Sequence, residues 1–215
     1  MRCGIGSMRG HYAGGSERML KRTEKKEEGN DMAEKGIVNG VNVDDLFGVI
    51  DAITGNSKIA DFQFRITSKW VNGGHSRSTV GDFYGALETQ TRQPFILDSA
   101  EHPVLLGEDQ APNPVEFVLH GLAGCLTTSL VYHAAARGHK ITKVESTLEG
   151  DLDLHGFLGM DEKVRSGYSN IRVTMKVEGD VPEETLAELI EVAKARSPVF
   201  DALSNPVSVS VQLGK

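Results

Sequence analysis

Alternation of apolar and polar side chains is the clearest pattern in this chain, and it predicts strands in both halves. Over residues 62–70, Phe62, Phe64 and Ile66 alternate with polar residues, as in a strand with one buried face. The Asn-Gly-Gly sequence at 72–74 favours a hairpin turn. The other predicted strands are residues 76–89, 95–97, 140–154, 171–177 and 207–213. In the strand at 76–89, the side chains expected to point inward are Val80, Tyr84 and Leu87.

The longest apolar segment, residues 113–138, predicts a helix. Asn113 and Pro114 form a helix-start pair, and Glu116 follows three residues after the asparagine, as in a capping box. Gly138 marks the end. Small or apolar residues occupy every face between, which is typical of a helix buried on all sides. At about 1.5 Å per residue it spans roughly 36 Å, so we expect the central core helix.

Two shorter helices complete the predicted elements. Asn42 can cap a helix over residues 42–55, and Pro182 begins another that carries an apolar stripe. Residues 155–169 form a glycine-rich excursion between strands. Because strands cluster around the helices, with no alternating strand–helix rhythm and no glycine-rich phosphate loop, the fold class is predicted to be α+β.

Composition narrows the possible partners and compartment. The 215 residues carry a net charge of −7, which argues against nucleic-acid binding. Residues 1–35 are rich in glycine and charge, and we expect a disordered tail ahead of one domain at 36–215. Two distant cysteines and the lack of an apolar leader favour the cytoplasm. Polar residues interrupt the segment 113–138, so we expect no membrane span.

Cys125, in the middle of the predicted core helix, is the main candidate for chemistry. From the residues alone, the favoured interpretation is a small buried apolar residue, because free cysteine is among the most buried residue types. A reactive role needs a thiolate, hence a nearby cation or donor. Gly121 and Ser129 lie one turn away on the same face, and neither is a cation. The cation must therefore come from elsewhere, and the candidates on the first sheet are Arg65, His75 and Arg77.

Other polar residues have simpler interpretations. The spacing of Glu116 from Asn113 favours capping, and nine residues place it about half a turn away from Cys125. His120 and His133 lie roughly 20 Å apart along the helix, too far to share a metal ion. Asp151, Asp153 and His155 alternate on one strand and could bind a cation, although a solvated strand edge is the simpler interpretation. We therefore expect no metal and no cofactor.

The order of elements and two segments resemble the OsmC/Ohr family. NPVEFVLHGLAGC resembles the family's motif, in which Asn-Pro-Glu opens a helix that holds a reactive cysteine, and SPVFDALSNPVSV resembles its Cys-Pro-Val segment. GDLDLHGFLG looks like one branch of the family. The resemblance covers about residues 36–215. It implies an intertwined homodimer, with antiparallel sheets around two long central helices and a site at each end of the interface.

Better-known members of that family reduce organic hydroperoxides with two cysteines, an arginine and a glutamate. By the resemblance, the peroxidatic cysteine corresponds to Cys125. The glutamate position holds Val115 and the resolving-cysteine position holds Ser197, so the chain resembles a branch that lacks the resolving cysteine. The arginine position corresponds to His75, with Arg77 two residues later.

Three functions are consistent with these residues. The first is thiol-dependent reduction of organic hydroperoxides in oxidative stress defence, with Cys125 as nucleophile, His75 or Arg77 as activating cation and an external thiol as reductant. Its activity would be weakened or altered by Val115 and Ser197. The alternative is a catalytically degenerate dimer that binds an apolar small molecule at its interface. A third possibility is other thiol chemistry, such as redox sensing or thiol transfer.

Overall fold

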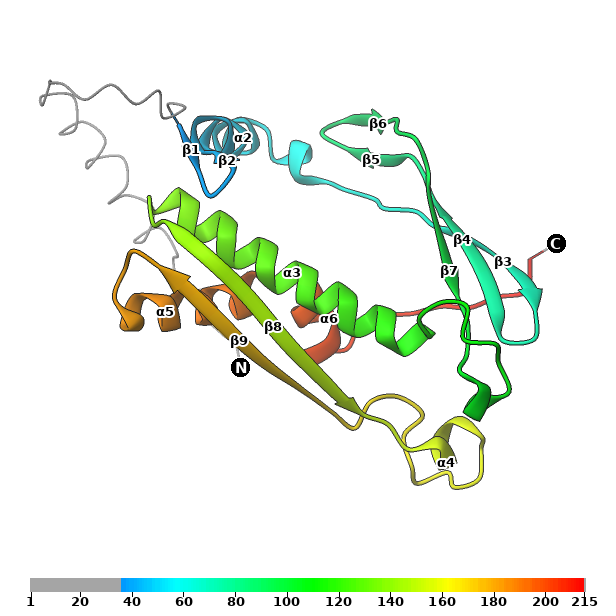
Figure 1. Ribbon diagram of the computed structural model, residues 1–215. Helices are drawn as coiled ribbons and strands as arrows, with labels where there is room; N and C mark the ends of the chain where they lie inside the picture. The colour runs from blue at the N-terminus through cyan, green and yellow to red at the C-terminus, as the bar shows by residue number, and fades with distance from the viewer. Residues whose placement is uncertain (1–35, 215) are drawn as a thin grey trace, which may run out of the picture. The chain divides into compact units, whose positions relative to one another are not determined.

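The computed structural model describes residues 36–214 of the chain (Figure 1). The predicted tail, residues 1–35, lies outside the described residues. Within them the fold is mixed α+β, with antiparallel strand pairs and one long helix, as the sequence predicts.

The long helix α3, Pro114–Ala136, begins and ends where local sequence rules place it. The Asn113 side chain accepts a hydrogen bond from the Glu116 backbone N–H at 2.9 Å. The Asn113 N–H donates to Glu116 Oε2 at 2.8 Å. This reciprocal capping box satisfies two donors that the first helical turn leaves open. At the other end Gly138 has φ +72°, the left-handed geometry that glycine adopts without strain.

The core of the described residues lies between α3, helix α5 (Glu183–Arg196) and the hairpin of β8 (Ile141–Asp151) and β9 (Asn170–Gly179). Leu130 and Ala134 of α3 pack against Leu189 and Ala193 of α5, and all four are fully buried. Figure 1 shows β8 and β9 running alongside α3. The hairpin buries its apolar face there and exposes its charged face. Burying each large aliphatic side chain contributes about 1.5–3 kcal/mol.

The prediction that α3 is buried on every side is wrong for the single chain. Leu122, Leu126, Leu130 and Ala134 are buried, but the opposite stripe is exposed. That stripe, spaced four residues apart, consists of His120, Gly124, Thr128 and Tyr132. The elements of one chain cover one side of the helix, and nothing in the described residues covers the other.

A separate three-stranded sheet is formed by β3 (Thr67–Asn72), β4 (His75–Val80) and β7 (Phe95–Ser99), in the order β3-β4-β7. The hairpin turn at 72–74 and the strand at Phe95 are confirmed. The predicted strand at 62–70 is only partly right, because residues 62–66 lie outside β3 and only Gln63 makes a bridge. Both faces of the sheet are open, and Trp70 and Phe95 are 74% and 59% exposed.

The predicted single strand at 76–89 is in fact β4 followed by a second hairpin, β5 (Phe83–Gly85) and β6 (Glu88–Gln90). Its turn residues Ala86 and Leu87 both have positive φ, 53° and 70°. Hairpin turns with positive φ usually contain Asn or Gly, and neither occurs at these two positions. The sequence pattern therefore gave no indication of this turn. Leu87, expected inside, lies at the turn and is 47% exposed.

Helix α2 (Val43–Gly55) is confirmed, with the Asn42 side chain accepting from the N–H groups of Asp44 and Asp45. Before it, β1 (Ile37–Val38) and β2 (Val41–Asn42) form a short hairpin. The Asn39 side chain in that turn bonds Ile141 N–H and His139 C=O, at 2.8 and 2.9 Å. The remaining short helices are η2 (Ser57–Ala60), η3 (Pro103–Leu105), α4 (Leu154–Phe157) and α6 (Pro198–Ser204).

The last predicted strand, residues 207–213, does not form in the single chain. Residues 206–214 carry no assigned helix or strand. The apolar side chains of this C-terminal segment are strongly exposed, with Val209 at 77% and Val211 at 93%. Alternation marks a strand only where a neighbouring strand pairs with it, and none does so within residues 36–214.

Among the described residues, α3 is the one helix whose length and apolar composition would allow it to cross a membrane. One such helix is weak evidence for a membrane span.

Candidate functional site

Cys125 lies near the midpoint of α3, with a free and partly buried thiol. The helix offers space on its side: a side chain added at Gly121 or Gly124 would meet no atom within 4 Å of its Cβ. Gly124 belongs to the exposed stripe of α3. A small molecule or a second protein surface can therefore approach the helix next to this cysteine.

The predicted cations on the first sheet are organised by a residue that the sequence analysis missed, Asp98 of β7. Arg77 Nε donates to Asp98 Oδ1 at 2.8 Å, and Arg77 Nη2 donates to Asp98 Oδ2 at 3.0 Å. His75 Nε2 lies 3.1 Å from Asp98 Oδ1. We call these three residues the Asp98 clamp.

The clamp has a clear electrostatic signature. The Arg77 guanidinium, and then the His75 ring, hold the pKa of the Asp98 carboxyl down at about 2 by hydrogen bonding to its charged form. The same carboxylate raises the pKa of Arg77. Asp98 is therefore a carboxylate and Arg77 a guanidinium at neutral pH.

The structure brings His75 and Arg77 together but joins neither to Cys125 within one chain. The end of β7 is tied to the start of α3 by the Ala100 N–H to Pro112 C=O hydrogen bond, 3.2 Å long. Cys125 lies roughly 17 Å further along the helix axis. No hydrogen bond or ion pair in the described part of the chain links the thiol to the clamp. The third candidate, Arg65, instead donates to Gln63 at 2.6 Å.

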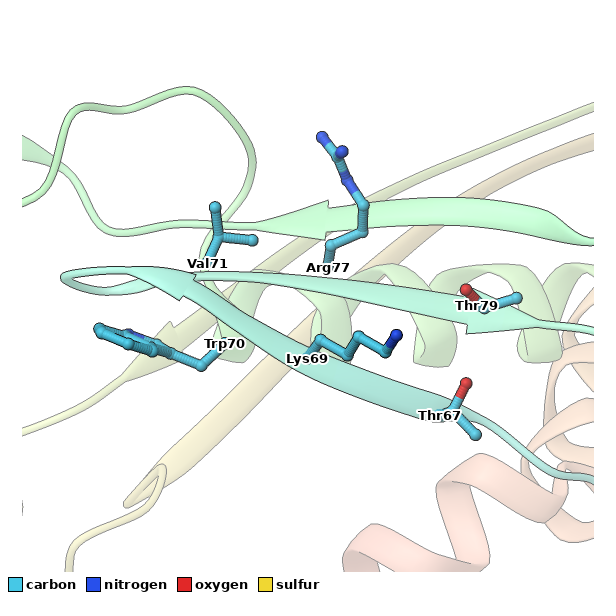
Figure 2. A pocket seen from close by; sticks show the side chains of 6 residues that line it. All are labelled: Thr67, Lys69, Trp70, Val71, Arg77 and Thr79. Atoms are coloured by element: carbon cyan, nitrogen blue, oxygen red, sulfur yellow. The ribbon is translucent and has the colours of Figure 1, made fainter.

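Arg77 also lines a shallow groove of about 390 Å³ on one face of the sheet (Figure 2). Lys69 and Arg77 are direct cross-strand partners, as are Thr67 and Thr79. Figure 2 shows Lys69 extending toward the two threonines, while Trp70 and Val71 lie nearer the turn. The lining of the groove is thus cationic and polar at one end and apolar at the other.

Of the two positions at which the resemblance implies a departure from the family motif, Ser197 has a structural role through its side chain, and Val115 makes a contact through its backbone. Val115, in the first turn of α3, accepts a hydrogen bond from Tyr168 Oη through its backbone C=O, at 2.9 Å. Ser197 is only 1% exposed, and its hydroxyl accepts from the Phe200 N–H at 3.2 Å, which caps α6. Glu116 is held in the capping box, as predicted. The first turn of α3 therefore offers Arg77 no carboxylate, because residue 115 is a valine and Glu116 is bonded to the Asn113 N–H.

The remaining polar candidates have local partners or none that suit a metal. Asp151 pairs with Arg172 across β8 and β9. Asp153 caps α4 and bonds His155. Burial, and then the charges of Arg137 and Arg196, lower the pKa of His133, which favours its neutral form. Within residues 36–214, no group of three or more His, Cys, Asp or Glu side chains could hold a metal ion.

Comparison with known proteins places this architecture. Residues 107–212 match the family model described as OsmC-like protein. An OsmC like protein from Mycoplasma pneumoniae superposes with a TM-score of 0.53 at 16% identity, over 67% of this chain and 89% of that one. A Legionella pneumophila structure, described as an organic hydroperoxide resistance protein OsmC, gives a TM-score of 0.45 at 19% identity over 66% and 88%. No curated protein matches this chain. The first superposition shows a shared fold.

Proposed function

This chain belongs to the OsmC-like family, and from that premise we propose that it reduces organic hydroperoxides with the thiol of Cys125, using an external thiol as reductant. The observation that carries the proposal is the free, partly exposed thiol at the centre of α3, next to open space at Gly121 and Gly124. A buried packing cysteine would have neither exposure nor room for a substrate.

The active form in this proposal is a homodimer. Three surfaces of the single chain support it: the open sheet with Trp70 and Phe95, the exposed stripe of α3, and the C-terminal segment. The sheet and the C-terminal segment expose large apolar side chains, which is typical of a protein interface, and the stripe of α3 leaves one side of the core helix uncovered. In the dimer, the partner's sheet packs along the exposed side of α3 and brings the partner's Arg77 to Cys125, and the space beside Gly121 receives the hydroperoxide between them.

The reaction then follows the chemistry of a thiolate. The sulfur attacks the terminal oxygen of the hydroperoxide, so that an S–O bond forms while the O–O bond breaks. The departing alkoxide takes the proton that the thiol lost and leaves as an alcohol. Cys125 is oxidised to a sulfenic acid, and the hydroperoxide is reduced. The partner's Arg77 favours the thiolate and stabilises the negative charge on the departing oxygen.

Regeneration needs a thiol from outside the described fold, because Ser197 is a buried helix cap without sulfur. A reductant thiol condenses with the sulfenic acid, releasing water and forming a mixed disulfide. A second thiol then releases Cys125 and leaves as the reductant disulfide. Cytoplasmic thiols suit this role, and we propose the cytoplasm as the compartment.

Steady-state turnover of cumene hydroperoxide with dithiothreitol tests the proposal. We expect the wild type and Cys3→Ser to consume hydroperoxide at equal rates, and Cys125→Ser to be inactive. The matched control is informative because Cys3 and Cys125 are the chain's two cysteines. Wild-type protein without turnover would overturn the proposal and favour the alternative, a dimer that binds an apolar molecule.

A further inference from the structure

We infer that Asp98 is the positioning residue of this site: it holds the Arg77 guanidinium in the orientation in which that group meets the reacting atoms. The inference rests on the proposed function and adds to it a residue that the family motif does not contain. In this chain the orienting carboxylate comes from strand β7 of the sheet, and not from helix α3.

The contact geometry fixes Arg77 in two ways. Its Nε and Nη2 both bond the one carboxylate, 2.8 and 3.0 Å from the two oxygens. A side-on pair of this kind fixes the plane of the guanidinium. The Nη1 edge is then directed away from Asp98 and is available to another acceptor, such as a sulfur or a peroxide oxygen.

The carboxylate is itself held in place. Arg77 and Asp98 are cross-strand partners in the β4–β7 register, so the backbone fixes their separation. His75, two residues earlier on the same face of β4, bonds Asp98 Oδ1 at 3.1 Å and limits rotation of the carboxylate. Exposure rises along the clamp, from 17% for His75 to 32% for Asp98 and 56% for Arg77. The supporting groups are thus the more buried ones, and the cation that they support reaches outward.

The other carboxylates near this sheet and helix do not hold Arg77. Glu116 is bonded to the Asn113 N–H in the capping box. The Glu101 side chain packs against Gly74 in the β3–β4 turn, and not against Arg77. The neighbouring cation, Lys69, faces Arg77 across β3 and β4, and like charges placed in this way repel each other. Asp98 is therefore the carboxylate that holds the plane of the Arg77 guanidinium.

Removing the charge of Asp98 should therefore affect the Cys125 thiolate and the rate of hydroperoxide reduction differently. Asp98→Asn leaves the charge of Arg77 uncompensated, which favours a nearby thiolate or leaves it unchanged. The same substitution releases the guanidinium from its fixed plane, so the departing oxygen loses an oriented donor. Thiol alkylation should persist while hydroperoxide reduction falls. General damage to the fold would lower both.

The experiment uses the full chain and two readouts at Cys125: the single-turnover rate with cumene hydroperoxide and the alkylation rate with iodoacetamide. For Asp98→Asn we expect the peroxide rate to fall about 10- to 100-fold, the range for losing a hydrogen bond between charged groups. Alkylation should be unchanged or faster. Asp98→Glu should restore part of the peroxide rate. The matched control is Asp151→Asn, which removes a carboxylate of the same kind from the Arg172 pair on the other hairpin.

A double-mutant cycle makes the assignment specific. In an Arg77→Ala background, Asp98→Asn should lower the peroxide rate no further, because the residue acts through the guanidinium. An Asp98→Asn protein with the wild-type peroxide rate, or with an equal loss in both backgrounds, would overturn the inference while leaving the proposed function intact. A wild type that does not react with the hydroperoxide would overturn both.

Discussion

At the scale of residues, the Arg77–Asp98 pair makes a prediction about acid titration. The folded pKa of Asp98, about 2, lies below the value of about 3.9 for an unperturbed aspartate. The pair therefore contributes stability above the unfolded pKa, and this contribution is lost as pH falls through the folded pKa. By NMR of the Asp98 side-chain carboxyl, we expect a midpoint near 2 in the wild type and a clear increase in Arg77→Ala. The same midpoint in both proteins, near 3.9, would contradict the clamp.

Residues also differ in how far the sequence predicts them. Glu116 follows a local rule, three residues from Asn113, and its capping role is confirmed. Asp98 follows no local rule: its partners on β4 lie 21 and 23 residues away, and only the strand register brings them together. No spacing in the sequence indicates that register, so the clamp could not be predicted even though two of its members were named as candidates.

At the scale of elements, the β5–β6 turn stores avoidable strain. Leu87 has φ +70°, a geometry that costs an L-residue roughly 1–2 kcal/mol. Leu87→Gly should therefore raise the free energy of unfolding by about 1 kcal/mol, measured by urea denaturation. The matched control is Leu203→Gly in helix α6, where a similarly exposed leucine has helical geometry. There the same change should lower stability by about 1 kcal/mol. Destabilisation at both positions would show that the turn is not strained.

The elements that the sequence predicts well are those whose signals are local. Helix α3 begins and ends at its caps, and β9 alternates cleanly, so both were expected. The β5–β6 hairpin was missed because Ala86 and Leu87 are not turn-forming residues. Residues 207–213 alternate like a strand but form none within the single chain. Alternation indicates that one face becomes buried, and it does not indicate whether the same chain or another one buries it.

At the scale of the whole molecule, the exposed C-terminal segment predicts a dimer. We expect sedimentation equilibrium to give about twice the chain mass of 23.3 kDa. Replacing Val209 and Val211 together by Asp should yield monomers, because charges would then occupy the face expected to pack on the partner. Replacing Ser208 and Ser210 by Asp changes the other face by the same charge and should leave the dimer intact. A wild type that is monomeric at micromolar concentration would contradict the proposed assembly.

At the same scale, an incomplete motif is compatible with the proposed site. The resemblance places Val115 and Ser197 where the family has a glutamate and a second cysteine. The Ser197 side chain caps α6, and Val115 bonds Tyr168 through its backbone C=O. A carboxylate is available to Arg77 from β7 instead. What the single chain lacks is a contact between Cys125 and that arginine, which the proposed second copy supplies.

The most direct measurement is the fate of the Cys125 sulfur after one equivalent of cumene hydroperoxide without reductant. We expect stoichiometric formation of a sulfenic acid, trapped by dimedone and assigned to Cys125 by peptide mass spectrometry, with one cumyl alcohol released per thiol. A Cys125 that remains a thiol under these conditions, in protein that is folded and dimeric, would contradict its proposed role as the nucleophile.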